Sequence, residues 1–561
     1  MKVTGSQALM KALVQLGVKT IYGYPGGAIM PVYDALYDYT DKIRHILVRH
    51  EQGASHAAEG EARLTGKPGV CLATSGPGAT NLVTGIADAM MDSVPMLAIT
   101  GQVASHLLGT DAFQETDIIG ITTPITKWNY QVTSADEVVE AIVKGYKIAN
   151  EGRPGPVLID ITKDAQMGMT DYVFPKNIKI DGFQPVTQPN GRAIKSAAEL
   201  LNNAKKPLML IGHGILISGA AKELVKFAEK SGIPVATTLH GLSAFPTGHK
   251  LYAGFLGMHG NYSPNKLTNH ADVILAVGMR FDDRVTGRLS DYAKNAKVIH
   301  IDIDPAELNK NVTAEIPIVA DAKPALIELT KNIKNRDHSA WINEFKKLDK
   351  DELEQVIKPE THPKKGKIKM AEVINLVSEK TKGEAVIVPD VGQHQMISAR
   401  YYKFTKPDSF ITSGGAGTMG FALPAAIGAK VAAPDRDVIA VIGDGGFQMT
   451  MQELMTISQE QLPVKIIILN NNFLGMVRQW QQLFYDKRYS FVNMTNPDFV
   501  KMAEACFIQG EKVTERKDLD KALNRTIESK KPYLLEIVVE QEDNVFPMIP
   551  TGASVEEVRL S

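Results

Sequence analysis

The sequence predicts an α/β protein built from three doubly wound parallel-sheet domains, and three observations lead to this fold class. Short apolar runs alternate with segments of helical periodicity along the whole chain, as sheets with crossover helices require. Polar clusters follow two successive apolar runs, at the points where parallel strands would end. The chain of 561 residues is also too long for one core and suggests about three or four domains.

Two breaks in the apolar periodicity divide the chain into three blocks of comparable size. One break covers 174–192, which contains several prolines, and the other covers 346–367, which is rich in charge. We expect both segments to be linkers. The expected parts are a first domain at 1–170, a central domain at 190–345, a third domain at 366–545 and a tail at 546–561.

The outer blocks share a short internal similarity. Residues 75–80 and 413–418 are glycine-rich turns that each follow an apolar run and precede an alanine-rich helix. A duplication would explain the likeness, and so would chance, because such turns are common in α/β proteins. A cofactor with a ring at one end and a diphosphate at the other would need two different grips, which two related domains could supply.

Composition excludes some classes of function. Apolar residues make up 44%, charged residues 22% and the formal net charge is -1, so no electrostatic case for nucleic acid or an anionic membrane follows. Residues 69–87 and 410–429 are uncharged, but small and polar residues interrupt both, which favours buried strand-loop-helix segments. Cys71 and Cys506 indicate a reducing compartment. A helix at 6–16 leaves no room for a signal peptide, so we expect a cytoplasmic protein.

In the first block, residues 46–49 predict a strand and residues 53–62 predict the helix after it. Glu51 therefore lies near the carboxyl end of a strand. Considered alone, it is an acid of the kind favoured at a helix amino terminus. His50 and His56 are too far apart for a zinc-binding helix motif.

The middle block opens with an apolar run at 208–211, followed by Gly212-His213-Gly214. A strand with a short glycine turn is typical of dinucleotide sites, although the full three-glycine fingerprint is absent. The residues alone leave open a nucleotide site or a vestigial nucleotide fold.

The third block holds the most informative pattern. Apolar runs at 438–442 and 464–469 predict neighbouring parallel strands, joined by a crossover helix over 447–462. Gly443-Asp444-Gly445 ends the first strand and Asn470-Asn471-Asn472 ends the second. Both polar clusters then lie at the strand carboxyl ends, where open α/β sheets bind ligands.

These clusters carry the ligand types of a metal-diphosphate site. A carboxylate, a side-chain amide and a nearby backbone carbonyl are hard oxygen ligands that suit Mg²⁺, which shares its other positions with phosphates and water. Gly445 and Gly446 let the backbone approach a phosphate, whose charge the helix amino terminus favours. The alternative is an Asp-Gly turn and a polar loop without a ligand.

The whole arrangement resembles the thiamine diphosphate signature. The resemblance implies that Asp444, Asn471 and the carbonyl of Phe473 hold Mg²⁺. The segment Arg-His-Glu-Gln-Gly at 49–53 resembles the one that carries the catalytic glutamate of these enzymes. The thiazolium ring needs a base, and the cofactor's aminopyrimidine can serve if a carboxylate hydrogen-bonds its far ring nitrogen. Glu51 is therefore the expected catalytic residue.

Longer blocks narrow the resemblance to one family. The segments 24–28, 110–115, 153–156 and 280–287 are similar to the catalytic subunits of the acetohydroxyacid synthase (acetolactate synthase) family, and the similarity covers essentially the whole chain. Catabolic relatives without FAD lack the 280–287 block, so the chain resembles the biosynthetic, flavin-containing form.

The resemblance implies a reaction and its cofactors. A thiamine diphosphate-dependent C–C ligase would decarboxylate pyruvate and transfer the hydroxyethyl unit to a second pyruvate or to 2-ketobutyrate. The products would be 2-acetolactate and 2-aceto-2-hydroxybutyrate, in the first common step of valine, leucine and isoleucine biosynthesis. The expected cofactors are thiamine diphosphate, Mg²⁺ and FAD. The net reaction needs no electron transfer, so the flavin would be structural.

The resemblance also assigns residues. At the reacting centre and the substrate entrance it implies Gly27, Gln114 and Lys163. For acceptor selection it implies Arg284, a planar fork suited to a carboxylate, and Trp480, a flat apolar face, together with Phe113 and Met476. The further thiamine diphosphate contacts would be Gln393, His394, Gly417, Met419, Asp444, Gly445, Gly446, Asn471 and Met476. The FAD contacts would be Arg153, Gly212, His213, Gly214, Thr238, Leu239, Met258, His259, Arg280, Asp282, Arg284, Asp302 and Asp321.

Assembly and closure are implied in the same way. The pyrimidine-type and diphosphate-type blocks of this superfamily meet across a subunit boundary, so a homodimer or homotetramer is expected, with a small regulatory subunit beside it. Residues 473–485 and the tail at 546–561 resemble the segments that close the active site; in the alternative, the tail is frayed. Ala104 is a departure, because the family often has proline there, where inhibitors bind.

Two other functions remain as alternatives. One is another thiamine-dependent 2-ketoacid decarboxylase or ligase, such as a pyruvate oxidase, which Arg284 and Trp480 disfavour. The other is a non-catalytic regulatory homologue that only binds cofactors. The joint presence of Glu51, Asp444 and Asn471 disfavours it.

Overall fold

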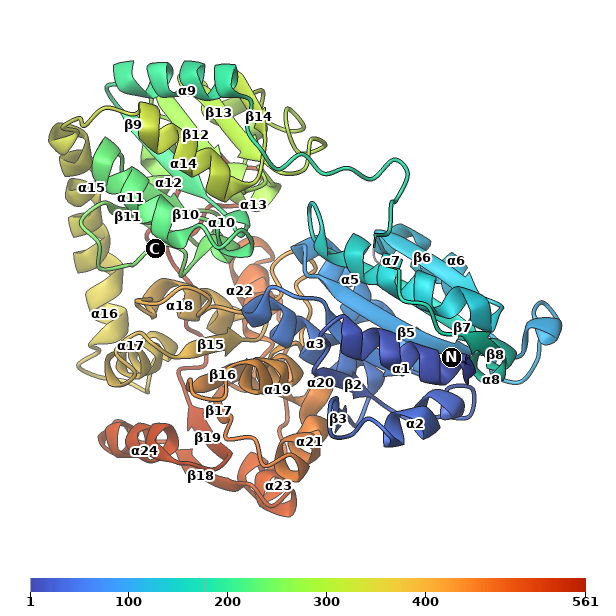
Figure 1. Cartoon of the computed structure of the whole chain (residues 1–561). Helices are drawn as coiled ribbons and strands as arrows, with labels where there is room; N and C mark the ends of the chain where they lie inside the picture. The colour runs from blue at the N-terminus through green and yellow to red at the C-terminus, as the bar shows by residue number, and fades with distance from the viewer. Residues whose placement is uncertain (1, 176) are drawn as a thin grey trace.

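The computed structural model describes residues 2–175 and 177–561, which form three α/β domains, each with its own parallel sheet (Figure 1). The predicted fold class is therefore confirmed. An antiparallel pair, β1 (Lys2–Thr4) and β8 (Met169–Asp171), joins the two ends of the first domain.

The first domain has a parallel sheet with the strand order β3-β2-β4-β5-β7-β6. Its strands are β2 (Thr20–Gly23), β3 (Arg44–Leu47), β4 (Gly69–Ala73), β5 (Met96–Gln102), β6 (Trp128–Val132) and β7 (Pro156–Thr162). Its helices are α1 (Gly5–Gln15), α2 (Met30–Tyr37), α3 (Glu51–Thr65), α4 (Pro77–Asn81), α5 (Val83–Asp92), α6 (Ile118–Thr122), α7 (Val138–Asn150) and α8 (Lys163–Met167). The strand expected at 46–49 lies two residues earlier, because the chain turns at His50 to begin α3.

The middle domain has the strand order β11-β10-β9-β12-β13-β14, so the direction of winding reverses between β9 and β12. Its strands are β9 (Pro207–Ile211), β10 (Val235–Thr237), β11 (Tyr252–Phe255), β12 (Val273–Val277), β13 (Lys297–Asp302) and β14 (Ile316–Val319). Its helices are α9 (Gly191–Asn203), α10 (Gly214–Ile217), α11 (Ala221–Ser231), α12 (Tyr262–Thr268), α13 (Asp283–Thr286), α14 (Ala322–Asn332) and α15 (Ser339–Glu352). Such a reversal opens a crevice at the strand carboxyl ends, where ligands bind.

The third domain has the strand order β15-β16-β17-β19-β18. Its strands are β15 (Val386–Pro389), β16 (Val438–Gly443), β17 (Lys465–Asn470), β18 (Gln509–Val513) and β19 (Tyr533–Val538). Its helices are α16 (Lys358–Thr361), α17 (Met370–Lys380), α18 (Gln393–Tyr401), α19 (Ala422–Ala432), α20 (Asp444–Thr450), α21 (Leu454–Gln459), α22 (Gly475–Phe484), α23 (Phe499–Ala505) and α24 (Arg516–Glu528). β16 and β17 are parallel neighbours, as predicted.

The crossover between β16 and β17 differs from the single helix expected over 447–462. It is divided into α20 and α21 by a 3₁₀ turn at Met451–Glu453. The buried Glu453 carboxylate accepts hydrogen bonds from the backbone N–H groups of Arg49 (3.0 Å) and His50 (3.1 Å). The break thus places an acid against the segment that leads into α3.

Of the two segments expected to be linkers, the first lacks regular structure over its described residues up to 190, and the second is largely helical. Residues 172–175 and 177–190 contain neither helix nor strand. In contrast, α15 reaches Glu352 and continues through a π-helical turn, Leu353–Ile357, into α16. Trp341 and Phe345 are buried on α15. Its charged residues before Glu352 are exposed or half-buried, and the buried Glu352 carboxylate pairs with Arg400 (2.5 Å). A helix with so narrow an apolar stripe has the composition of a linker.

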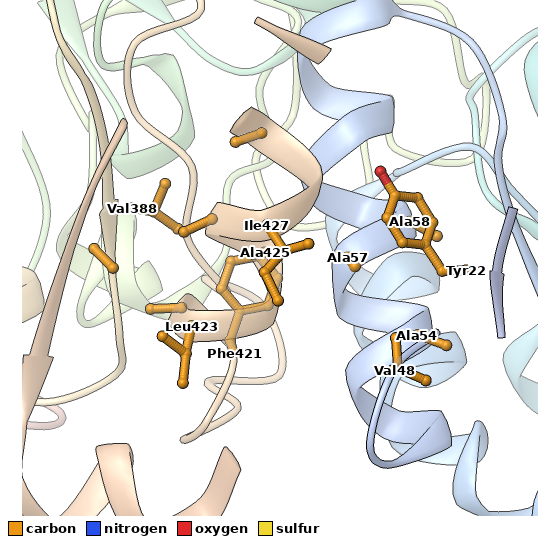
Figure 2. Close-up of a cluster of buried hydrophobic side chains, with 14 of the residues drawn as sticks. Tyr22, Val48, Ala54, Ala57, Ala58, Val388, Phe421, Leu423, Ala425 and Ile427 are labelled. Carbon is orange, nitrogen blue, oxygen red and sulfur yellow. The ribbon is translucent and has the colours of Figure 1, made fainter. Parts of the chain in front are cut away.

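The first and third domains share a core along α3 and α19 (Figure 2). A Cβ on Gly428 would lie 1.8 Å from the carbonyl oxygen of Ala57, and one on Gly60 would lie 2.0 Å from that of Ala425. The two helix backbones are therefore in direct contact through small residues. We call this contact the α3–α19 seam.

The carboxyl-terminal tail is packed against the middle domain, so the frayed alternative is wrong. The Ile549 N–H donates to the carbonyl of Met258 (2.8 Å), and Ser554 pairs with Gly287. Ile549 and Val555 are buried in the middle-domain core.

The two uncharged stretches form the buried strand-loop-helix segments that were predicted. The first begins with β4 and continues into α4 and α5, and the second leads from Phe410 into α19. Among the described residues, none of the helices combines the length and apolar character needed to cross a bilayer.

Candidate active site

A small cavity of about 50 Å³ lies at the carboxyl ends of β15, β16 and β17. It collects most of the residues assigned to thiamine diphosphate and its metal ion, namely Gln393, His394, Met419, Asp444, Gly445, Gly446, Asn471, Phe473 and Met476. Gly417, which was assigned with them, is not among the lining residues of the described chain.

The carboxylate in this cavity is suited to a cation. Burial raises the pKa of Asp444 to about 6, although Asn496 Nδ2 donates to its Oδ2 (2.7 Å) and opposes the shift. A bound divalent ion would favour the charged carboxylate. Asp444, Asn471 and Phe473 line the same small space, and a carboxylate, an amide oxygen and a backbone carbonyl are ligand types that fit Mg²⁺.

Asn496 belongs to this site although no sequence motif predicts it. Its amide nitrogen donates to Asp444 and also to Asn470 Oδ1 (3.1 Å) and Asn472 Oδ1 (3.0 Å). It therefore ties the strand end after β16 to the strand end after β17. It lies in an irregular segment before α23, where no pattern marks it.

His394 offers an unpaired group to the same cavity. Burial lowers the pKa of this imidazole to about 3, so the ring is neutral. Its Nε2 is buried and has no hydrogen-bond partner among the described residues. A Cβ on Gly443 would lie 2.7 Å from the ring, so the glycine before Asp444 makes room for it. An unpaired nitrogen here fits a polar ligand group.

Side-chain amides connect this cavity to the tail. Asn471 Nδ2 donates to Gln393 Oε1 (3.4 Å), and Gln393 Nε2 donates to Gln479 Oε1 (3.0 Å) and to the Asp543 carbonyl (2.8 Å). Gln479 Oε1 also accepts from the Val545 N–H (2.8 Å), and its Nε2 donates to the Val545 carbonyl (3.3 Å). α22, which carries Met476 and Trp480, is thereby joined to both the cavity and the tail.

Glu51 is the first residue of α3 and is buried. Asn81 Nδ2, a partner that the sequence did not reveal, donates to Glu51 Oε2 (2.9 Å). The helix start is fixed by His50, whose Nδ1 accepts from the Gln52 N–H (3.1 Å), and by Glu453 from the third domain. Within the described residues of one chain, Glu51 does not line the 50 Å³ cavity.

The residues expected at the reacting centre surround the turn after β4. Gly76 in this turn has a φ of 59°, and a Cβ there would lie 3.0 Å from Gln114 Cβ. The Ala28 N–H, next to Gly27, donates to Thr74 Oγ1 (3.2 Å). The turn therefore brings the segments of Gly27 and Gln114 together, and a Cβ on Gly78 would lie 3.3 Å from Glu51 Oε1.

The selection residues lie on other elements. Arg284 is exposed on α13, with its Nη1 3.5 Å from Met258 Sδ. Trp480 is half-buried on α22 and lies against Phe484, with ring centroids 4.9 Å apart. Phe113 is 88% exposed, and Lys163 is exposed at the start of α8.

A second, much larger cavity of about 700 Å³ lies where the first and middle domains meet, at the reversal between β9 and β12. Its volume is that of a site for a large organic cofactor. Among its lining residues are the flavin contacts expected at Arg153, Gly212, His213, Gly214, Thr238, Arg280, Asp282, Asp302 and Asp321. Leu239, Met258, His259 and Arg284 were assigned to the same group but do not line it.

The lining of the large cavity fits a flavin dinucleotide. A Cβ on Gly212 would lie 2.4 Å from the Gly278 carbonyl, so only glycine allows the turn after β9. Arg153 forms ion pairs with Asp304 (3.1 Å) and Glu307 (2.8 Å), which hold its guanidinium at the rim. Burial raises the pKa of Asp302 to about 6.

Three further residues line the large cavity although no sequence motif predicts them, namely Arg63, Asp92 and His240. Asp92 is the last residue of α5, where the helix dipole disfavours an acid. That placement is the one sequence signal that could have marked it.

Family models match all three domains. They are the N-terminal thiamine pyrophosphate-binding domain at 3–121, the central domain at 194–329 and the C-terminal thiamine pyrophosphate-binding domain at 390–537 of thiamine pyrophosphate enzymes. The fold and these matches define the chain as a thiamine pyrophosphate (thiamine diphosphate) enzyme.

Curated relatives narrow this class. The acetolactate synthase large subunit of Corynebacterium glutamicum is 46% identical, over 100% of this chain and 90% of the relative. The probable acetolactate synthase large subunit of Methanocaldococcus jannaschii is 47% identical, over 99% of this chain and 95% of the relative. The acetolactate synthase isozyme 3 large subunit of Escherichia coli K12 is 42% identical, over 100% of this chain and 99% of the relative. The chain belongs to the acetolactate synthase large-subunit family.

Proposed function

We propose that this chain is the catalytic subunit of a biosynthetic acetolactate synthase. It decarboxylates pyruvate and joins the remaining two-carbon unit to a second pyruvate or to 2-ketobutyrate. The observation that carries the proposal is the convergence of Asp444, Asn471 and Phe473 on one cavity at adjacent strand ends, in a chain of this family. The diphosphate and its ion would bind there.

Asp444, Asn471 and the Phe473 carbonyl would hold Mg²⁺, and Gln393, His394, Gly445 and Gly446 would surround the diphosphate. Met419 and Met476 would contact the rest of thiamine diphosphate, with Gly417 beside them. When bound, this cofactor supplies the electron sink for decarboxylation.

Glu51 would hold the proton that activates the cofactor ring. Its carboxylate is buried, and the Asn81 amide orients it, so it can make one fixed hydrogen bond to a ring nitrogen. Gly27 and Gln114 would lie beside the reacting atoms, because they flank the same turn.

Substrate selection would fall to Arg284 and Trp480, with Phe113 and Met476 nearby and Lys163 at the entrance. A guanidinium fork binds a carboxylate by two hydrogen bonds, and an indole face contacts the added methyl group of 2-ketobutyrate. The exposure of Arg284 and Phe113 supports a surface that a second chain covers.

A homodimer is the smallest assembly that we propose, and a tetramer would contain two such pairs. Glu51 and the diphosphate cavity of one chain are separate, so a second chain would supply the missing half of each site. Several relatives are named large subunits, which supports a small regulatory partner. The location that we propose for the assembly is the cytoplasm. FAD would occupy the 700 Å³ cavity.

The proposed domains are 1–170, 190–345 and 366–545, with the tail at 546–561 beside the active site. The three sheets and the family matches support these divisions. The contacts of Gln479 with Val545 support a tail that is coupled to the cavity.

The test is product formation from pyruvate by the purified chain, with thiamine diphosphate, Mg²⁺ and FAD each omitted in turn. We expect acetolactate only when all three are present. The Glu51→Gln variant should lose about 10²- to 10⁴-fold in turnover while still taking up the cofactor with Mg²⁺. Acetaldehyde as the main product would instead favour a simple decarboxylase.

A further inference from the structure

Residues from all three domains meet at the carboxylate of Asp92, at the end of α5. From the third domain, the N–H groups of Gly414 and Gly415 donate to Asp92 at 2.9 and 2.7 Å. From the first domain, Arg63 Nη2 donates to it at 2.8 Å. From the middle domain, His240 Nε2 lies 3.0 Å from Asp92 Oδ1. A single buried side chain is therefore in contact with every domain.

The third-domain partner is a loop of functional interest. We call residues 413–419 the cofactor loop, because they include Gly417 and Met419, two expected thiamine diphosphate contacts. Met419 lines the 50 Å³ cavity. The position of the backbone at Gly414 and Gly415 therefore influences the position of a cavity residue.

The cofactor loop is held by two acids on the same face of α5. Asp88, one turn before Asp92, accepts from Ser413 Oγ (2.6 Å) and from Thr418 Oγ1 (3.3 Å). There is little free space, because a Cβ on Gly414 would lie 2.2 Å from His240 Nε2. A small movement at either partner would displace the loop.

On its other side, Asp92 faces the large cavity. Asp92, Arg63 and His240 all line the 700 Å³ space, and so does His213, whose ring stacks on His240 with centroids 5.5 Å apart. Asp88 is not among the lining residues of the described chain. A ligand in the large cavity could therefore contact Asp92 and two of its partners, Arg63 and His240, but neither Asp88 nor its partners Ser413 and Thr418.

We propose that Asp92 is a positioning residue through which FAD in the 700 Å³ cavity sets the cofactor loop for thiamine diphosphate, so that each cofactor strengthens the binding of the other. The inference rests on the flavin site proposed above. In this proposal the flavin has a structural role, the positioning of the cofactor loop, in a reaction that needs no electron transfer. Because such coupling is reciprocal, both cofactors must gain by the same factor.

The test is a pair of titrations on the full-length chain stripped of both cofactors. Thiamine diphosphate is titrated at fixed Mg²⁺, with and without saturating FAD, and binding is followed by calorimetry. We expect FAD to lower the Kd for thiamine diphosphate by a factor of about 5 to 150, and the reverse titration to give the same factor. A factor of one in both directions would overturn the proposal.

Two matched variants localise the effect. Asp92→Asn keeps the size of the side chain but removes its charge, and we expect the coupling factor to fall toward one while both cofactors still bind. Asp88→Ala removes the oxygen that accepts from Ser413 and Thr418, so it loosens the same loop without reaching the large cavity. It should weaken thiamine diphosphate binding with and without FAD, and leave the coupling factor unchanged. The role of Asp92 is refuted if Asp92→Asn retains the wild-type factor.

Other outcomes separate this inference from the flavin assignment. If the wild-type chain binds thiamine diphosphate but no FAD, the proposed flavin site is wrong and the coupling falls with it. If both cofactors bind independently, only the coupling is wrong. Should Asp92→Asn fail to fold, His240→Gln removes the middle-domain partner instead, and it should also lower the factor.

Discussion

The side-chain amide of Gln479 pairs with both backbone groups of Val545, accepting from its N–H at 2.8 Å and donating to its carbonyl at 3.3 Å. Gln479 is buried on α22, next to Trp480, while Val545 lies just before the tail. The helix proposed to select the acceptor is thus joined to the segment proposed to close the site.

Replacing Gln479 with alanine should release the start of the tail. The change removes the acceptor of the Val545 N–H and one of the two acceptors of the Gln393 amide, at a cost of about 1 to 3 kcal/mol for each buried group left unpaired. We expect faster hydrogen exchange at Val545 and more acetaldehyde relative to acetolactate. Gln481→Ala is the control, because Gln481 lies on the same helix but is bonded to Ser490. Equal exchange at Val545 in both variants would contradict the prediction.

Asn496→Ala should weaken the metal site although it replaces none of the proposed ligands of the ion. The loss of its bonds to Asp444, Asn470 and Asn472 would free the two strand ends. Loss of a residue that hydrogen-bonds a metal ligand typically lowers metal affinity by about 10- to 100-fold. The measurement is the Mg²⁺ concentration that half-saturates thiamine diphosphate uptake, and Asn493→Ala, an exposed change in the same segment, is the control.

Trp480→Leu should preserve acetolactate formation but reduce the preference for 2-ketobutyrate. A methylene contact in a pocket is worth about 1 to 3 kcal/mol, or roughly 10- to 200-fold in selectivity. A competition assay with both 2-ketoacids reports the ratio of products. Phe484→Leu removes only the ring that lies against Trp480 and should change the ratio less. An unchanged ratio in Trp480→Leu would exclude this role.

Gly428→Ala should destabilise the α3–α19 seam. The new Cβ would lie 1.8 Å from the Ala57 carbonyl oxygen, so the helices must separate. Overpacking of this kind costs about 1 to 3 kcal/mol, occasionally more. The urea concentration at the unfolding midpoint should fall. Gly191→Ala, on α9, should not lower it, because a Cβ there meets nothing within 4 Å.

Asp88 should make stability depend on pH. Burial, with Glu59 and Asp92 nearby, raises the pKa of this carboxyl to about 8, while His56 and Ser413 oppose the shift. The protonated form is therefore favoured by folding, and its contribution is lost as pH rises from about 4 to 8. The unfolding midpoint in urea should fall more steeply between pH 5 and 8 in the wild type than in Asp88→Asn. Parallel curves would contradict the assigned pKa.

The edge of the third sheet was predictable because its signals are local. Asp444 and Asn471 each follow an apolar run, and neighbouring parallel strands bring the ends of such runs together. Asn496 could not be predicted in the same way, because it lies in an irregular segment before α23. Its position depends on tertiary packing, which short-range patterns do not record.

Other differences have equally physical causes. The charged segment after Phe345 has the sequence pattern of a linker, because a helix that buries few side chains has a weak apolar period. The break in the crossover at Glu453 is set by a partner in another domain, the backbone of Arg49 and His50. The residues of the large cavity came from family resemblance, since its walls belong to separate domains.

The α3–α19 seam has a consequence for how defective chains behave together. It holds Glu51 and the diphosphate cavity of one chain in a fixed relation in which they are not in contact. Two inactive proteins, one with Glu51→Gln and the other with Asp444→Asn, should therefore rescue each other when their subunits are exchanged. In each mixed pair, one active site would combine the intact Glu51 of one chain with the intact Asp444 of the other. The second active site would contain both substitutions.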